Sequence, residues 1–148
     1  MKRLGEKTII TNFLKQHTLA TIATVNPKNL KPESALIAFA ELENLEILFI
    51  TLEGSRKYTN LLQNTQVAMV IGWDKHYWRT LQYEGLAVSV EPAAVAYYKE
   101  LFSQKKDTPC TEVFLSNPDM KLFKITPTWI GYSDFTGKKP QVIELKNF

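Results

Sequence analysis

The segment Gly54-Ser55-Arg56-Lys57 combines the residue types of this sequence that are best suited to bind an anion. Ser55 supplies a hydroxyl, Arg56 a guanidinium and Lys57 an ammonium, and these groups together can hold the oxygens of a phosphate. The segment lies where a strand pattern gives way to a helical one, so the free N–H groups of a helix start would face the same anion. Thr51 adds a second hydroxyl just upstream. These residues predict a cradle for a mononucleotide phosphate.

A plainer interpretation of the same residues stays open. Serine is strongly preferred at the N-cap of a helix, so Ser55 also fits a purely structural role. Arg56 and Lys57 would then be solvated surface charges. The flanking segments have to decide between the two interpretations.

The other candidate groups give weaker evidence for a functional site. His17 and His76 are far apart in the sequence, and neither has a cysteine or carboxylate at ligand spacing, so we predict no metal site. His76 lies in the aromatic-rich stretch 73–78, which either borders a ligand or packs at an interface. Cys110 lacks the surrounding pattern of a nucleophile, and the pair Lys105-Lys106 is typical of solubilising charge.

Three carboxylates stand near predicted strand ends, where we expect them to face water. They are Glu33, Glu41 and Glu43.

Composition limits the class of protein. With 148 residues, of which 45% are hydrophobic, the chain has the size and apolar content of a single domain, 1–148. A net charge of +3 lacks the clustering expected of a nucleic-acid binder. One cysteine excludes an internal disulfide, and no apolar run is long enough to span a bilayer. We expect a cytoplasmic protein that contacts neither nucleic acid nor membrane.

The elements that must position the cradle begin with a helix and a meander. Apolar side chains at helical spacing predict a short amphipathic helix over residues 6–16. Residues 18–25 and 33–42 have strand patterns and flank the turn-forming residues 26–29. A third strand pattern, 46–52, follows a second short turn. We therefore expect three antiparallel strands.

The remainder adds helices and further strands. The expected elements are a short helix from residue 58 to about 64, strands at 66–73 and 79–91, a helix from Pro92 to about residue 106, a loop at 107–118, a strand at 121–135 interrupted at Pro127, and a short strand at 142–145. Residues 66–73 are apolar on both faces, which predicts a strand between the core and a partner. This order indicates an α+β barrel rather than a parallel doubly wound fold.

Several of these stretches together resemble the pyridoxamine 5′-phosphate oxidase-like family of FMN-binding split barrels. The matching stretches are Leu19-Ala20-Thr21-Ile22-Ala23-Thr24-Val25, Leu48-Phe49-Ile50-Thr51, Gly54-Ser55-Arg56-Lys57, Asn60-Leu61, Asn64 and Arg79-Thr80-Leu81-Gln82-Tyr83-Glu84-Gly85. The resemblance runs from about residue 12 to residue 135. It implies an antiparallel split β-barrel of the Greek-key type, with about six to seven strands and flanking helices.

The resemblance also implies a cofactor and a partner. Members of this family bind FMN in a groove at a homodimer interface, with the phosphate on the residues that match Ser55, Arg56 and Lys57. The second strand would run beside the isoalloxazine ring, and the strand at 79–91 would present Thr80 and Gln82 to the flavin. Thr80 stands at the position of the family's glutamine, and Gln82 is the alternative two residues further on. The expected FMN-binding residues are Ser34, Ala35, Leu36, Thr51, Ser55, Arg56, Lys57, Thr80 and Gln82.

The sequence departs from the vitamin B6 oxidase itself. The arginine and lysine that this oxidase carries on its second strand are missing from the stretch Ser34-Ala35-Leu36-Ile37-Ala38-Phe39-Ala40, and no arginine follows Arg79. Residues 127–135 instead resemble the small stress-protein-like members. We therefore expect an FMN-dependent oxidoreductase that acts on an unidentified small molecule. The alternative is a non-catalytic sensor or stress module that binds a flavin or haem, and a deazaflavin is a further possible cofactor.

Overall fold

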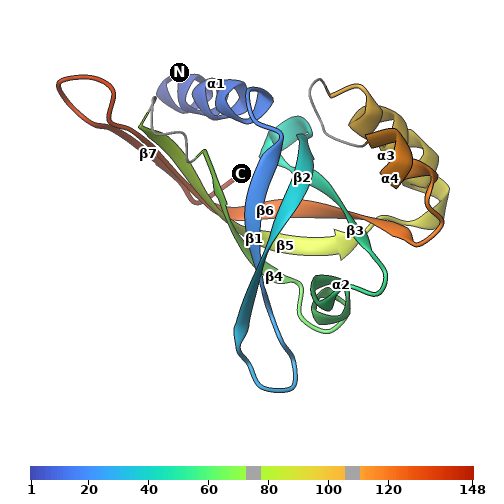
Figure 1. Cartoon of the computed structure of the whole chain (residues 1–148). Helices are drawn as coiled ribbons and strands as arrows, with labels where there is room; N and C mark the ends of the chain where they lie inside the picture. The colour runs from blue at the N-terminus through green and yellow to red at the C-terminus, as the bar shows by residue number, and fades with distance from the viewer. Residues whose placement is uncertain (73–77, 106–110) are drawn as a thin grey trace.

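The computed structural model describes residues 1–72, 78–105 and 111–148 (Figure 1). Its centre is an antiparallel sheet in the order β3-β2-β1-β4-β5-β6-β7, and an additional β3–β6 pairing closes the first six strands into a barrel. The strands are β1 Leu19–Val25, β2 Pro32–Glu41, β3 Ile47–Leu52, β4 Gln66–Ile71, β5 Arg79–Ser89, β6 Met120–Asp134 and β7 Gln141–Leu145. The helices are α1 Lys2–Lys15, α2 Arg56–Leu61, α3 Val95–Ser103, α4 Thr111–Ser116 and the short 3-10 helices η1 Glu43–Leu45 and η2 Pro92–Ala94.

The strand order is that of a Greek key. Strands β1, β2 and β3 form a meander, and β4 returns to lie beside β1, which gives the spatial order 4-1-2-3. The predicted α+β antiparallel split barrel with flanking helices is therefore confirmed. Figure 1 shows α1 and the adjacent pair α3 and α4 toward one end of the barrel, and α2 toward the other.

Some predicted boundaries were wrong. The first helix begins at Lys2, four residues earlier than expected, and the helix expected from Pro92 starts as a 3-10 turn and ends at Ser103. The expected loop at 107–118 contains α4. The His76 and Cys110 predictions lie outside the described residues. No helix in the described ranges is both long and apolar enough to cross a bilayer.

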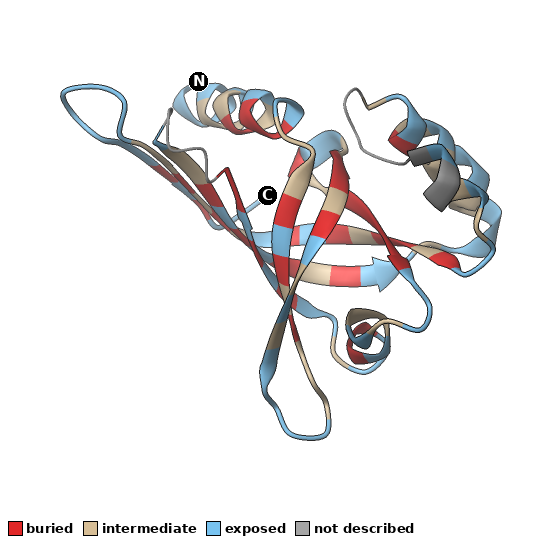
Figure 2. Ribbon diagram, in the orientation of Figure 1, coloured by how far each residue is buried: buried red, intermediate tan, exposed pale blue. Residues whose placement is uncertain are grey.

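The barrel interior is filled by alternate residues of the strands, as the banding in Figure 2 shows. Strand β4 buries Val67, Met69 and Ile71 and leaves the residues between them exposed in this chain. Strand β3 differs, because its residues from Ile47 to Thr51 are all buried. Its outer face carries Leu48 and Ile50 into a second apolar cluster that Phe102 of α3 completes.

Two local features adjust the barrel wall. The predicted interruption at Pro127 is a register shift between β5 and β6, where Gly85 lies opposite Pro127. A side chain at Gly85 would place its Cβ 2.6 Å from the carbonyl oxygen of Thr126, so only glycine fits this close approach. The register shift separates the part of β6 that pairs with β3, residues 120–125, from the part that pairs with β7, residues 130–134.

The split in the barrel lies between β2 and β3. Strand β2 pairs with β1 from Pro32 to Ala38 but with β3 only from Phe39 to Glu41. Because the Phe39 N–H donates to the Thr18 carbonyl, the alternation of an antiparallel pair directs the N–H and C=O of Ser34 and Leu36 away from β1. The first half of β2 therefore offers backbone hydrogen-bonding groups along a free edge.

Candidate functional site

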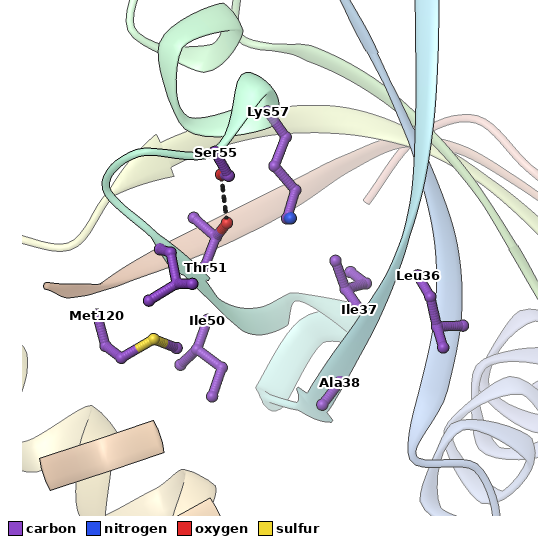
Figure 3. Close-up of a pocket in the computed structure, with 9 residues that line it drawn as sticks. Leu36, Ile37, Ala38, Ile50, Thr51, Ser55, Lys57 and Met120 are labelled. Carbon is purple, nitrogen blue, oxygen red and sulfur yellow. Dashed lines mark hydrogen bonds between the residues drawn. The ribbon is translucent and has the colours of Figure 1, made fainter. Parts of the chain in front are cut away.

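Two adjoining cavities lie in this split, between the free edge of β2 and the segment that joins β3 to α2. The apolar cavity, of about 190 Å³, is lined by Leu36, Ile37, Ala38, Ile50, Thr51, Leu52, Ser55, Lys57 and Met120 (Figure 3). The polar cavity, of about 200 Å³, is lined by Thr24, Glu33, Ser34, Ala35, Ser55, Arg56 and Lys57. Of the residues that the structure describes, Ser55 and Lys57 line both cavities. These two residues therefore stand at the junction.

Ser55 has a structural role and a place in the site. It is the N-cap of α2, where its Oγ accepts the Tyr58 N–H at 3.3 Å, so the capping role predicted for this residue is confirmed. Its Oγ also lies 2.8 Å from Oγ1 of the buried Thr51. These contacts fix the Ser55 hydroxyl at the junction of the cavities, and Figure 3 shows the Thr51 contact as a dashed line. Thr51 supports Ser55 rather than standing apart from it.

Lys57 is not the solvated surface charge of the plainer interpretation. Its side chain is half-buried and lines both cavities, and burial lowers the pKa of its ammonium below the usual value. Among the described residues, no ion pair or side-chain hydrogen bond involves Lys57. Figure 3 shows the ammonium pointing into the space between Thr51 and Ile37. A partly desolvated cation without a partner favours the binding of an anion beside it.

The Arg56 side chain points toward the carboxylate of Glu33, which we expected from the sequence to face water. Its side chain is 75% exposed, and its Nε lies 3.2 Å from Oε2 of Glu33, whose side chain is only 13% exposed. The expectation that Glu33 faces water was therefore wrong. Glu33 also accepts hydrogen bonds from Asn26 Nδ2 at 2.8 Å and from Asn60 Nδ2 at 3.5 Å.

Asn60 extends this network into the barrel wall. It is buried in α2, and its Nδ2 donates to Oγ1 of the buried Thr24 at 2.9 Å. Glu33, Asn26 and Asn60 were not among the predicted site residues. The one signal for them was Asn60, a polar residue next to Leu61 on the apolar face of a helix.

The second strand contributes the residues that were predicted to flank a ring. Ser34 and Ala35 line the polar cavity, and Leu36, which is 58% exposed, lines the apolar cavity. The structure thus brings together seven predicted residues: Ser34, Ala35, Leu36, Thr51, Ser55, Arg56 and Lys57. Because α2 has only six residues, the side chains rather than a helix dipole supply the attraction for an anion.

Thr80 and Gln82 lie elsewhere. Both are on β5, and the register Leu36–Thr21–Val70–Gln82 places Gln82 three strands from β2 on the outer face of the sheet. Three strand spacings of about 4.8 Å separate Gln82 from Leu36, or roughly 14 Å. The Thr80 hydroxyl donates to the Ile71 carbonyl at 3.4 Å. Neither residue lines the cavities of its own chain.

The histidine that the structure describes is engaged in packing. Nδ1 of His17 lies 2.8 Å from the Phe13 carbonyl, and its ring lies against that of Phe13, with centroids 4.2 Å apart. Within the described ranges, no group of three or more histidine, cysteine, aspartate or glutamate residues is arranged to hold a metal ion.

The closed antiparallel barrel, with cations beside the cavities between β2 and β3, places the chain in the class of α+β split barrels. The chain belongs to the pyridoxamine 5′-phosphate oxidase family, whose family model matches residues 8–134. No curated protein sequence gives a match.

Solved structures support the same fold. A pyridoxamine 5′-phosphate oxidase-related, FMN-binding protein from Nostoc punctiforme is 15% identical, with a TM-score of 0.67 and coverage of 95% of this chain and 96% of that one. A relative of general stress protein 26 from Clostridium acetobutylicum is 17% identical, with a TM-score of 0.70 and 95% of each chain covered. A heme binding protein from Mycobacterium smegmatis is 10% identical, with a TM-score of 0.73, over 92% of this chain and 56% of that chain. The chain thus spans little more than half of that longer protein.

Proposed function

We propose that residues 1–148 form a single domain that binds FMN between two subunits of a homodimer and acts as a cytoplasmic, FMN-dependent oxidoreductase on a small molecule. The observation that carries the proposal is the half-buried Lys57, which lies at the junction of the two cavities and has no anionic partner among the described residues. A phosphate placed there would bind the Lys57 ammonium and the Ser55 hydroxyl, with Arg56 at the rim. The FMN-binding relative from Nostoc punctiforme supports this choice of ligand.

The apolar cavity suits the ring of the cofactor. Leu36, Ala38, Ile50 and Met120 offer an apolar surface to one edge of an isoalloxazine. The free N–H and C=O groups of Leu36, which lines this cavity, would meet the polar edge of the ring. When bound, the flavin supplies hydride transfer, and the chain supplies binding, orientation and exclusion of water.

The proposed dimer would complete a site that one chain leaves open. The apolar cavity that would take the ring, at about 190 Å³, is smaller than the roughly 300–1,000 Å³ typical of pockets that enclose a ligand. Thr80 and Gln82 are too distant to reach the ring from the same chain. A second copy that packs its outer β5 face over the split would complete the pocket and bring these residues to the flavin.

The alternative function is a non-catalytic module that binds a flavin or haem, and the heme binding protein from Mycobacterium smegmatis is the observation in its favour. Haem iron takes an axial ligand such as histidine, cysteine, methionine or tyrosine. Of the residues that line the two cavities, Met120 is the one of these types, and His17 packs against Phe13 instead. The described site therefore favours FMN.

The test compares FMN with riboflavin, which lacks the phosphate. Titration of the purified apoprotein, followed by flavin fluorescence, should show tighter binding of FMN. Lys57→Ala should reduce that preference by roughly 10- to 100-fold, as expected for the loss of a charge-assisted hydrogen bond, and Lys57→Arg should retain part of it.

Lys121→Ala serves as the matched control, because Lys121 is a surface lysine paired with Glu53. Equal affinities of the wild type for FMN and riboflavin would refute the phosphate cradle. A Soret band in the purified protein would support haem instead.

A further inference from the structure

Glu33 lies on the wall that a phosphate would face. Among the described parts of the chain, Ser55 and Lys57 are the residues that the apolar and polar cavities share. A ligand with its ring in the apolar cavity and its phosphate on these two residues therefore has the outer side of its phosphate turned toward the polar cavity. Glu33 lines that cavity. This inference rests on the proposed function, because it takes the ligand to be a flavin phosphate.

The Glu33 carboxylate is held in place from three directions. Asn26 of the β1–β2 turn donates to Oε1 at 2.8 Å, and Arg56 and Asn60 of α2 approach Oε2 at 3.2 and 3.5 Å. Asn60 is itself tied to the buried Thr24. Such a network fixes the carboxylate, so it cannot swing into solvent without loss of several hydrogen bonds.

The two cations of the polar cavity have different partners. Arg56 forms an ion pair with Glu33, whereas Lys57 is available to bind a ligand. One phosphate group is enough to satisfy Lys57 and Ser55. A second anionic group attached beyond that phosphate would have to lie beside the fixed carboxylate of Glu33, and like charges placed together disfavour a ligand.

We propose that Glu33 is a specificity-determining residue that restricts the site to flavins ending in a single phosphate, and that it excludes flavins whose phosphate carries a further anionic group. FMN belongs to the first class. FAD, with its diphosphate, belongs to the second. The carboxylate acts by repulsion of the wrong ligand rather than by contact with the right one.

The experiment measures the affinities of FMN, FAD and riboflavin for the wild type and for Glu33→Gln, which keeps the size of the side chain and removes its charge. The wild type should bind FMN at least roughly tenfold more tightly than FAD, and Glu33→Gln should narrow that ratio by a similar factor. Glu91→Gln is the matched control, because Glu91 is exposed at the start of η2 and lines neither cavity. It should leave the ratio unchanged.

A second measurement needs no variant. In the wild type, the ratio of FMN to FAD affinity should fall between about 0.05 M and about 0.5 M salt, since salt screens a partly exposed like-charge repulsion. Equal affinities of FMN and FAD, a ratio independent of salt, or an unchanged ratio in folded Glu33→Gln would overturn this proposal while leaving tight FMN binding intact. Absence of any preference for FMN over riboflavin would instead contradict the proposed function, and this inference with it.

Discussion

Tyr83 carries a buried phenolic hydroxyl in the core of the barrel. The hydroxyl donates to the Leu45 carbonyl at 2.9 Å and lies 3.3 Å from the carbonyl of Ile125. It thereby ties β5 to η1 and β6. Burial, with a smaller effect of the Glu46 charge, raises the pKa of this phenol well above its ordinary value.

Tyr83→Phe should destabilise the protein by about 1–2 kcal/mol at neutral pH, because two buried carbonyls lose a donor. The difference should depend on pH. A phenol whose folded-state pKa is raised stabilises the fold fully below the unfolded-state pKa of about 10, and this stabilisation falls by about 1.4 kcal/mol per pH unit above it. Urea unfolding of both proteins from pH 8 to pH 11 checks this. The difference in unfolding free energy between the wild type and Tyr83→Phe should shrink above about pH 10. A difference that stays constant with pH would show that the Tyr83 hydroxyl is not buried as described.

The site residues differ in how far the sequence alone could predict them. Ser55 and Lys57 stand together in the sequence, so their chemistry is visible without a fold. The role of Glu33 was not visible, because its partners Asn26 and Asn60 are 7 and 27 residues away and come from a turn and a helix. A carboxylate near a strand end is ordinarily solvated, and only the packing of α2 against β1 and β2 encloses this one.

At the scale of elements, Lys105 fastens the segment after α3 to the barrel. Its side chain is 6% exposed, and its Nζ lies 2.6 Å from Oε2 of Glu41 on β2, 3.2 Å from the Leu14 carbonyl of α1 and 4.2 Å from the ring centroid of Phe39. Burial lowers the pKa of Lys105, and Glu41 offsets part of that effect. The expectation of a solubilising surface charge at Lys105, and of a water-facing Glu41, was wrong.

Lys105→Met should destabilise the protein by about 2–3 kcal/mol, because Glu41 then keeps a mostly buried carboxylate without its cation. Adding Glu41→Gln to this variant should restore part of the loss, since the uncompensated charge is removed. Lys121→Met, which breaks an exposed pair with Glu53, should change stability by less than about 0.5 kcal/mol. Urea midpoints at neutral pH measure all three. Equal effects at Lys105 and Lys121 would contradict the account of this contact.

Elements were predictable where the local pattern decides them. Alternation of apolar residues identifies β1, β2 and β5 to within a few residues. Strand β3 was predicted at 46–52 and lies at Ile47–Leu52, although its residues do not alternate, because its second face packs against Phe102 of α3 and is apolar too. The local pattern misses α4, a six-residue helix between proline-containing segments, since so short a helix is stabilised by its tertiary contacts rather than by its own pattern.

At the scale of the whole molecule, closure of the barrel depends on residues that are distant in sequence. The β3–β6 pairing joins Ile47 to Ile125 and Leu52 to Met120. No local pattern predicts such a pairing, so the split barrel came from the family resemblance and the family match then supported it. Without the resemblance, the order of the predicted elements indicated only an α+β barrel.

The outer face of the sheet is the surface where we expect the second subunit. Val70, 41% exposed, lies in one row with Leu36 and Gln82. Val70→Lys should convert the proposed dimer to a folded monomer and weaken FMN binding, because the proposed partner would desolvate a lysine there. Light scattering coupled to size exclusion gives the oligomeric state, and circular dichroism verifies the fold.

Leu4→Lys is the control for that variant, because Leu4 is exposed on α1, away from the row of Val70. It should remain dimeric and bind FMN normally. A wild-type protein that is monomeric with FMN bound would show that one chain suffices for the site.

The central claim, that the split of the barrel holds a flavin phosphate on Ser55 and Lys57, is tested most directly by a crystal structure of the protein with FMN. We expect the phosphate oxygens within hydrogen-bonding distance of Ser55 Oγ and Lys57 Nζ, with the ring along the free edge of β2. A phosphate bound away from these two residues, or a flavin bound elsewhere on the barrel, would contradict the account.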